Sequence, residues 1–227
     1  MEHNMSANTV ARAYLDDALS IDHRLALKTA ATRLQTEFDD LFGAETIERF
    51  LHSSYGQFAE RASIPRFLPL LAERFAQQRL RALARVEGKH HDGKQTVLFL
   101  CTHNAGRSQM AMGFFTQLAG DAAVAWSGGS EPGNEVNPAA VEAMAERGID
   151  ISHEYPKPWT DEIVQAADVI VTMGCGDACP VFPGRRYEDW KLEDPAGLGV
   201  GAVRPIRDEI ERRVRELLTE LAVTIHT

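Results

Sequence analysis

The stretch Gln95–Met112, QTVLFLCTHNAGRSQMAM, constrains the fold more than any other part of the chain. It opens with an apolar run, Thr96–Leu100, whose β-branched and aromatic residues predict a buried strand ending at Cys101. The apolar residues beyond the following turn recur at helical spacing, at Met110, Phe114 and Leu118. The stretch therefore predicts a strand, a short loop and a helix, with Arg107 and Ser108 at the start of the helix.

A loop that leads into a helix N-terminus is suited to hold an anion, and here it also carries a thiol. Backbone N–H groups without partners point into one small space, and the helix dipole adds partial positive charge. The guanidinium of Arg107 can hold two oxygens of a tetrahedral oxyanion, and the same field stabilises a thiolate at Cys101. The oxyanion-binding residues that we predict are Thr102, His103, Asn104, Ala105, Gly106, Arg107 and Ser108. A free cysteine often merely ends a buried strand, but the arginine after this loop favours a catalytic nucleophile.

From Gln95 onward, strand-like and helix-like segments alternate. This pattern predicts an α/β domain over residues 95–227, built on a small, doubly wound and mainly parallel sheet of four strands. The strands predicted after the first are 122–126, 168–173 and 187–190. Three further helices are predicted. One begins at Asn137-Pro138, and a second runs from the cap Thr160 through Ala166. The third is indicated by the apolar stripe Ile206, Ile210, Val214, Leu217 and Leu221. Anion sites in such sheets lie at the C-terminal ends of strands, where Cys101 is placed.

Residues 1–88 contain no strand-like run, and their helical periodicity predicts an all-α domain. Three stripes of apolar residues at helical spacing predict a three-helix bundle. The first runs from Leu27 to Leu41 and the second from Ile47 to Phe58, and the third starts near Ser63 and Pro65. A short helix in front is predicted from Val10, Tyr14 and Ala18. The polar segment 89–94 is predicted to link the two domains. Two copies of the chain are expected to form a homodimer through these N-terminal helices.

Four basic residues gather at the end of the helical segment, namely Arg79, Arg81, Arg85 and Lys89. A nucleic-acid contact is one interpretation, but a solvated helix face is the more common one, and we favour it. The formal net charge of −9 agrees with this choice. Nothing in the chain supplies a broad basic face, so binding to nucleic acid or to an anionic membrane is not expected.

The cysteine content and the absence of export signals indicate a reducing compartment. The chain has 3 cysteines, no apolar run long enough to span a bilayer, and a start, MEHNMSANTV, without the layout of a secretory signal. We therefore expect a cytoplasmic protein whose thiols are reduced at rest. No metal site is predicted, because no further cysteine and no nearby His pair could complete one with Cys175 and Cys179.

The motif Cys101-x5-Arg107-Ser108, on a strand, loop and helix, resembles the low-molecular-weight protein tyrosine phosphatase family. Flanking residues resemble its arsenate reductase branch, beginning with Gln109, where the phosphatases usually have proline. The further segments that resemble this branch are 129–132 (GSEP), 136–138 (VNP), 142–144 (EAM), 148–152 (GIDIS), 172–180 (TMGCGDACP) and 194–196 (DPA). Together they cover nearly all of residues 95–221.

The resemblance implies roles for the loop residues and for one aspartate. Cys101 would attack the arsenic of arsenate, which phosphate or sulfate can mimic, while the loop N–H groups and the arginine hold the oxyanion. Ser108 would donate a hydrogen bond to the thiolate, and Asn104 would brace the loop. Asp194, in an Asp-Pro pair, is the expected general acid for the departing oxygen. His103 is assigned to loop packing or solvent.

A reductase must also supply two electrons, and the resemblance assigns this task to Cys175 and Cys179. In the thioredoxin-coupled branch, a second cysteine attacks the cysteine–arsenic adduct, releases arsenite and leaves a disulfide. A third cysteine attacks that disulfide and carries the oxidation to thioredoxin, so no bound cofactor is needed. The last two cysteines lie closer together here than in better-known members. A second route therefore stays open, in which mycothiol and a glutaredoxin-like mycoredoxin regenerate Cys101 alone.

Two other functions stay open from the sequence. A phosphotyrosine phosphatase would use the same scaffold, but such enzymes usually follow the Asp-Pro pair with tyrosines that hold an aromatic substrate. Ala196 and Gly197 stand there in this chain, which favours a small inorganic oxyanion. A non-catalytic oxyanion sensor would need neither Asp194 nor the later cysteine pair. Arsenate reduction is therefore the function that we predict.

Overall fold

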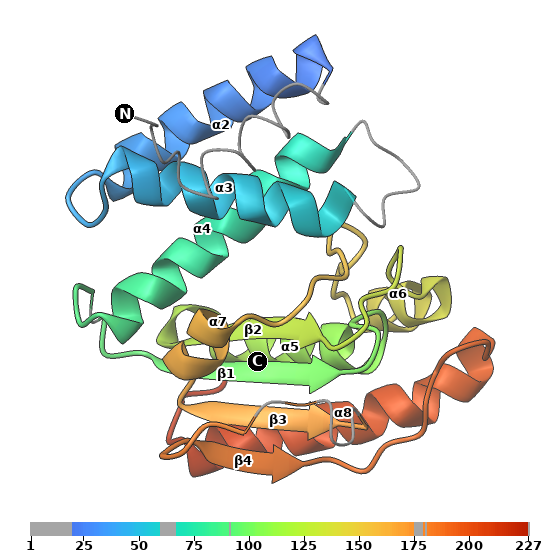
Figure 1. The fold of residues 1–227 in the computed structure, drawn as a ribbon. Coiled ribbons are helices and arrows are strands. Elements are labelled where there is room, and N and C mark those ends of the chain that lie inside the picture. The colour runs from blue at the N-terminus through green and yellow to red at the C-terminus, as the bar shows by residue number, and fades with distance from the viewer. Residues whose placement is uncertain (1–19, 60–66, 91, 175–178, 180, 227) are drawn as a thin grey trace, which may run out of the picture. The chain divides into compact units, whose positions relative to one another are not determined.

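The computed structural model describes residues 20–59, 67–90, 92–174, 179 and 181–226 (Figure 1). The chain divides after Arg81 into two compact units, the first all-α and the second α/β. The helix α4, Leu68–Val86, carries the chain from the first unit into the second. The short helix predicted around Val10, Tyr14 and Ala18 lies outside the described residues.

Three helices make up the described part of the N-terminal unit, as the apolar stripes predicted: α2 (Ile21–Phe38), α3 (Ala44–Ala59) and α4. Ser20 caps α2, because its side chain accepts a hydrogen bond from the N–H of His23 at 3.3 Å. The buried side chains of this unit include Leu27, Leu34, Phe38, Ile47, Leu51, Phe58 and Phe75. The residues near which the third helix was predicted to start lie outside the described part of the chain, and α4 begins at Leu68.

The expectation of a solvated basic face is wrong for Arg79, which is only 9% exposed. Its guanidinium lies 4.6 Å from the ring centre of Phe50 and 5.6 Å from that of Phe75. It also donates hydrogen bonds to Ser53 Oγ at 2.7 Å and Ser54 Oγ at 3.2 Å. Arg79 is therefore part of the core of the helical unit, where stacking and hydrogen bonds compensate for the loss of water.

The C-terminal unit contains a four-stranded sheet in which every pair of neighbours is parallel. Its strands are β1 (Gln95–Cys101), β2 (Ala123–Gly129), β3 (Val169–Met173) and β4 (Arg186–Asp189), in the order β2-β1-β3-β4. The prediction of a mainly parallel, four-stranded sheet is confirmed. β1 occupies the centre of the sheet, and its last residue, Cys101, pairs with the last residues of β2 and β3.

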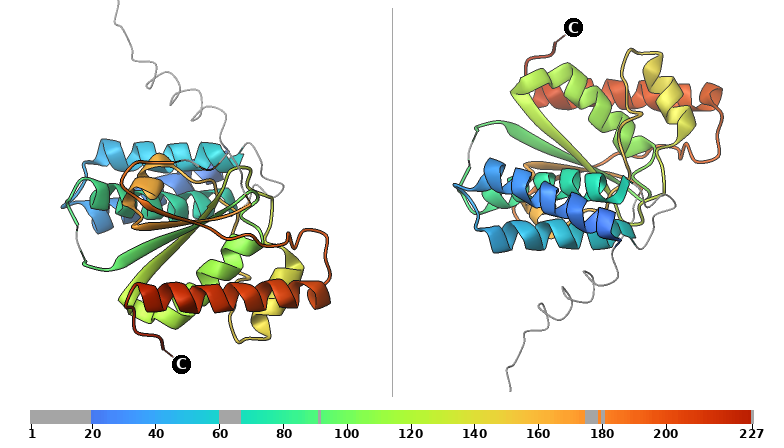
Figure 2. Two further views of the ribbon diagram at one scale, coloured as in Figure 1. Left: turned by 90° about the horizontal axis from the view of Figure 1, so that it is seen from below. Right: turned by 90° about the horizontal axis from the view of Figure 1, so that it is seen from above.

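Helices cover both faces of this sheet (Figure 2). On one face, α5 (Arg107–Ala119) and α6 (Pro138–Ala145) both pack against α8 (Val200–Glu220). A short 3-10 turn, Gly120–Ala122, joins α5 to β2, and α7 (Asp161–Ala166) lies beside β1 on the other face. The apolar cluster beneath α5 and α8 includes Phe99, Met110, Phe115, Met144, Trp190, Ile210 and Leu218. Within the described residues, no helix combines the length and the apolar character needed to cross a membrane.

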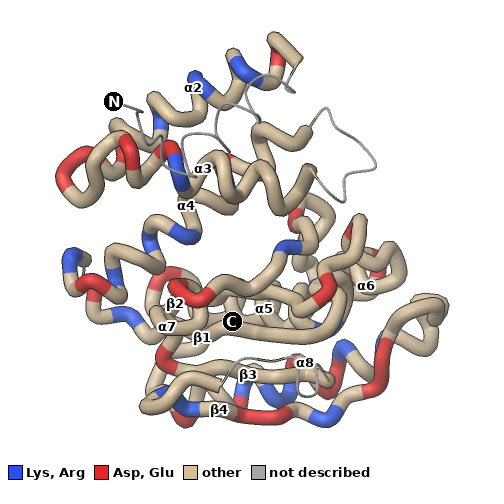
Figure 3. Tube along the Cα trace, viewed as in Figure 1, with Lys and Arg blue, Asp and Glu red and all other residues tan. Residues whose placement is uncertain are grey.

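Acidic and basic residues alternate along α8 (Figure 3), and two of its arginines hold Glu146, the residue that follows α6. Arg204 and Arg207 donate hydrogen bonds to this carboxylate at 2.6 and 2.7 Å, and they lower its pKa from 4.5 to about 2. Between pH 4.5 and about 2, the unfolded chain therefore binds a proton that the folded chain does not. The stabilisation is present above this range and is lost as the pH falls through it.

We expect Glu146→Gln to flatten the dependence of the free energy of unfolding on pH across this range, as measured by urea denaturation. The matched control is Glu135→Gln, which replaces an exposed loop glutamate and should keep the wild-type slope. A slope in Glu146→Gln that equals the wild-type slope would contradict the expectation.

Candidate active site

The loop of residues 102–106 joins the C-terminal end of β1 to the N-terminus of α5. Three of its carbonyl oxygens accept hydrogen bonds from N–H groups of the segment that follows β2. These pairs are Thr102–Glu131 at 2.9 Å, His103–Gly133 at 2.8 Å and Ala105–Asn137 at 2.8 Å. These hydrogen bonds direct the three carbonyls toward the outer segment, and the N–H group of Asn104 points instead at the sulfur of Cys101.

The sulfur of Cys101 faces this loop, although the residue is only 2% exposed. Its Sγ lies 3.0 Å from Ser108 Oγ and accepts a hydrogen bond from the N–H of Asn104 at 3.2 Å. Ser108 Oγ accepts a hydrogen bond from Asn104 Nδ2 at 2.8 Å, so the serine proton is available to the sulfur. Two hydrogen-bond donors thus point at Sγ.

Asn104 is buried and has a φ of 47°, in the left-handed region that asparagine tolerates better than most residues. Its Oδ1 accepts hydrogen bonds from the N–H of Lys157 at 2.9 Å and from Gln109 Nε2 at 3.2 Å. Gln109 Nε2 also donates to the Asn104 carbonyl at 2.9 Å. Asn104 therefore braces the loop from within, and Gln109, where a proline would have no donor, supports it from α5.

Arg107 is 6% exposed, and its Nη2 donates to Asp194 Oδ2 at 2.9 Å. Asp194 is half exposed, and its other oxygen accepts a hydrogen bond from the N–H of Ala196 at 3.0 Å. The structure therefore brings together the arginine and the aspartate that the resemblance singled out. The aspartate lies on the loop after β4.

A small pocket of about 40 Å³ lies over the sulfur. It is lined by Cys101, His103, Ala105, Gly106, Arg107, Asn137, Asp194, Pro195 and Ala196. This volume is large enough to hold a small inorganic oxyanion. His103 lies exposed on the rim with its Nδ1 3.0 Å from the Glu131 carbonyl oxygen, and we assign it no proton transfer.

The segment after β3 begins beside the pocket, because Met173 pairs with Cys101 in the register of β1 and β3. Cys175 lies outside the described residues. Cys179 is disulfide-bonded, whereas Cys101 is free. The expectation that the thiols are reduced at rest is therefore wrong for Cys179 in this structure, whereas Cys101 keeps a free thiol.

Gly174, the residue after β3, lies against the guanidinium of Arg107. It has a φ of 77°, and a Cβ added to it would stand 2.6 Å from Arg107 Nη1. We expect Gly174→Ala to displace the guanidinium and to weaken phosphate binding by roughly tenfold or more, as measured by calorimetry. The matched control is Gly148→Ala, which has a φ of 72° but open space around the added carbon. If both variants bind phosphate equally well, the contact with Arg107 does not matter for the anion.

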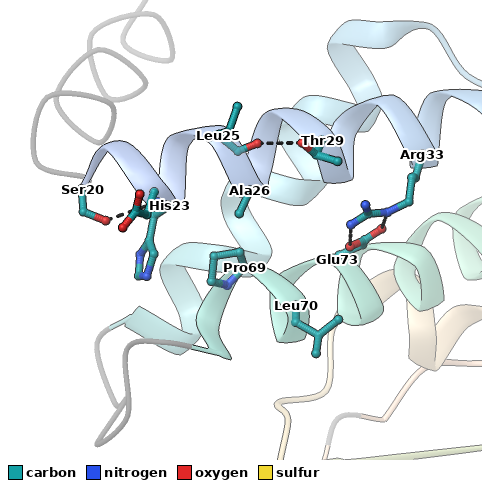
Figure 4. Close-up of a pocket in the computed structure, with 10 residues that line it drawn as sticks. Ser20, His23, Leu25, Ala26, Thr29, Arg33, Pro69, Leu70 and Glu73 are labelled. Carbon is teal, nitrogen blue, oxygen red and sulfur yellow. Dashed lines mark hydrogen bonds and ion pairs between the residues drawn. The ribbon is translucent and has the colours of Figure 1, made fainter.

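A larger hollow of about 710 Å³ lies on the helical unit between α2 and α4 (Figure 4). Its described lining includes the apolar side chains of Leu25 and Leu70 and the ion pair of Arg33 with Glu73 at 2.6 Å. No cysteine is among the described residues that line it. Nor do any three His, Cys, Asp or Glu side chains converge as a metal site in the described parts of either unit. The small pocket, by contrast, is lined by Cys101.

Asn137, Pro195 and Ala196 also line the small pocket, although they were not among the predicted site residues. The Asn137-Pro138 pair was interpreted as the start of a helix and as part of a segment that resembles the arsenate reductase branch; it does start the helix, because Asn137 Oδ1 accepts a hydrogen bond from the N–H of Ala139 at 2.9 Å. Nothing local in the sequence indicates that the same side chain also reaches the pocket.

Two family models match the chain. Residues 96–226 match the one described as low molecular weight phosphotyrosine protein phosphatase, and residues 27–84 match the one described as protein-tyrosine-phosphatase-like, N-terminal domain. The similarity therefore extends over both units of the structure. It includes the helical one, which the motifs noted in the sequence do not cover.

Proteins named as arsenate reductases are similar to this chain. Arsenate reductase 1 of Staphylococcus epidermidis is 42% identical over 125 residues, which cover 53% of this chain and 93% of the relative. Arsenate reductase 2 of Staphylococcus haemolyticus is 40% identical over 130 residues, or 56% of this chain and 98% of the relative. Among solved structures, the thioredoxin-dependent arsenate reductase Cg_ArsC1' of Corynebacterium glutamicum is 42% identical with a TM-score of 0.80, covering 88% of this chain and 98% of its own.

Proposed function

The chain belongs to the low molecular weight phosphotyrosine protein phosphatase family, and from this premise we propose that it reduces arsenate to arsenite with electrons supplied by thiols. The observation that carries the proposal is the free sulfur of Cys101 at the base of a pocket of about 40 Å³ that Arg107 also lines. Such a pocket fits an inorganic oxyanion, and proteins named as arsenate reductases are among the relatives that match both units and among those that match the α/β unit alone.

In the first step, the thiolate of Cys101 attacks the arsenic atom of arsenate and forms a sulfur–arsenic bond. Arg107 and the N–H groups at the start of α5 hold the arsenate oxygens and the charge that develops on them. Asp194, which lines the same pocket, donates a proton to the departing oxygen, which leaves as water. No electrons have been transferred at this point, and the arsenic remains in its oxidised form.

In the second step, the thiol of Cys175 attacks the sulfur of Cys101. The electron pair of the sulfur–arsenic bond goes to arsenic, arsenite leaves, and a disulfide joins the two cysteines. Cys179 then attacks Cys175, which frees Cys101 and leaves a disulfide for thioredoxin to reduce. Two observations support this order: the chain leaves β3 next to Cys101, and Cys179 is disulfide-bonded. The alternative is attack on the adduct by mycothiol, completed by a mycoredoxin-like protein.

The test is steady-state arsenate turnover with thioredoxin, thioredoxin reductase and NADPH, compared with turnover supported by mycothiol and its redoxin. We expect the wild type to turn over with thioredoxin and Cys175→Ser to stop after the first chemical step. If Cys175→Ser still cycles at the wild-type rate with thioredoxin as the sole reductant, the relay is wrong. Efficient hydrolysis of an aryl phosphate without arsenate reduction would replace the reductase with a phosphatase.

A further inference from the structure

Asn137 uses every hydrogen-bonding group it has, and it connects three parts of the active site. Its N–H donates to the Ala105 carbonyl of the oxyanion loop at 2.8 Å. Its Nδ2 donates to the Pro195 carbonyl at 2.9 Å, and its Oδ1 accepts from the N–H of Ala139 at 2.9 Å. One residue therefore joins three parts of the site: its backbone N–H binds the oxyanion loop, and its side chain binds the first turn of α6 and the loop that carries Asp194.

The loop of Asp194 is held at the pocket by the ion pair of Asp194 with Arg107 at 2.9 Å and by the contacts of Pro195. It lies between β4 and α8, and Asp194 and Ala196 are both exposed. Pro195 between them is buried and packs against Gly106, where an added Cβ would stand 2.6 Å from Pro195 Cγ. The contact with Gly106 is apolar and has no preferred direction, whereas the hydrogen bond from Asn137 fixes the orientation of the Pro195 peptide group.

We propose that Asn137 is a positioning residue that holds the carboxyl group of Asp194 over the oxyanion pocket by anchoring the Pro195 carbonyl. The role of Asp194 in this inference rests on the proposed function. A general acid must lie within hydrogen-bond reach of the oxygen it protonates, and small misplacements cost much of its effect. Asn137 also satisfies the N-terminus of α6, so the loop is anchored to a helix that is itself packed against α8.

The informative variant is Asn137→Asp, which has the same shape and caps a helix as well, but has no donor for the Pro195 carbonyl. Asn137→Ser keeps a capping oxygen without adding charge, and it separates loss of the anchor from repulsion of the anion. In both variants we expect the single-turnover rate of arsenite release to fall by about 10- to 100-fold. Phosphate affinity should change much less in Asn137→Ser.

The double variant with Asp194→Ala tests whether Asn137 acts through Asp194. If it does, Asn137→Ser combined with Asp194→Ala should be no slower than Asp194→Ala alone. Rate losses that multiply would overturn the proposal, because Asn137 would then contribute independently of the acid.

Hydrogen exchange tests the anchor without relying on any reaction. The N–H groups of Ala196 and Leu198 donate to Asp194 Oδ1 at 3.0 Å and to the Pro195 carbonyl at 3.2 Å. We expect both amides to exchange faster in Asn137→Ser than in the wild type, while the amides of α8 keep their rates. Unchanged exchange at both amides would overturn the proposal that Asn137 anchors the Pro195 carbonyl. If the wild type cannot reduce arsenate, the proposed function is refuted instead. The exchange rates would still show whether Asn137 holds the loop of Asp194.

Discussion

Replacing Cys101 with serine is expected to abolish arsenate reduction, because a hydroxyl neither forms the sulfur–arsenic bond nor takes part in a disulfide. The substitution should disturb the structure little. The neighbours of Sγ are Ser108 Oγ at 3.0 Å and the N–H of Asn104 at 3.2 Å, and a serine hydroxyl can interact with both. We expect arsenite release in a single turnover to fall by a factor of at least about 10⁴, as when a catalytic nucleophile is removed from other enzymes.

Two measurements make this result specific to the nucleophile. Phosphate affinity should stay within a few-fold of the wild type, because the loop N–H groups and Arg107 remain in place. The matched control is Cys179→Ser, which should keep single-turnover release because the proposed relay uses this residue only after arsenite has left. Appreciable turnover by Cys101→Ser would mean that the nucleophile lies elsewhere in the chain.

The apolar runs were enough to predict the central strands of the sheet, because β1 and β3 are buried along almost their whole length, whereas β4 has no buried residue. β1 was predicted at Thr96–Leu100 and spans Gln95–Cys101. β2 was predicted to end at Trp126, but it continues to Gly129. The prediction stopped early because Gly128 and Gly129 have little β propensity. Pairing with β1 extends β2, and a Cβ added to Gly129 would stand 2.6 Å from the Thr102 carbonyl oxygen. This close contact between two backbone segments forms only in the folded sheet, so the periodicity of the sequence does not predict it.

Some residues of the candidate active site are close together in the sequence, and others are brought in from distant positions of the chain. Cys101, Arg107 and Ser108 lie within one strand–loop–helix stretch, so their proximity could be predicted from spacing alone. The contact of Arg107 with Asp194 joins residues 87 positions apart, and only the family resemblance suggested that aspartate. The outer hydrogen bonds that turn the loop carbonyls away, including the one from Asn137, depend on tertiary packing and could not be predicted from any local pattern.

Replacing Asp194 with alanine is expected to slow arsenite release by a factor of roughly 10² to 10⁴, the usual contribution of a positioned general acid. The same carboxylate pairs with Arg107 at 2.9 Å and lines the pocket, so it also adds negative charge where the anion must bind. We therefore expect the rate to fall while phosphate affinity is retained or increases. Rapid-quench measurement of the first turnover, together with calorimetry of phosphate binding, separates the two effects.

The opposite changes in rate and affinity distinguish an acid from a residue that merely orients the arginine. If Asp194 served only to hold the guanidinium of Arg107, its loss would weaken phosphate binding and the rate together. Glu193→Ala is the matched control, because it removes a carboxylate from the adjacent position of the same loop and should leave both quantities near the wild type. An unchanged rate in Asp194→Ala would remove this residue from the chemistry. Proton delivery would then be expected from solvent. Of the other titratable side chains on the described pocket lining, Cys101 is the nucleophile, Arg107 holds the anion, and His103 lies on the exposed rim with its Nδ1 engaged by the Glu131 carbonyl.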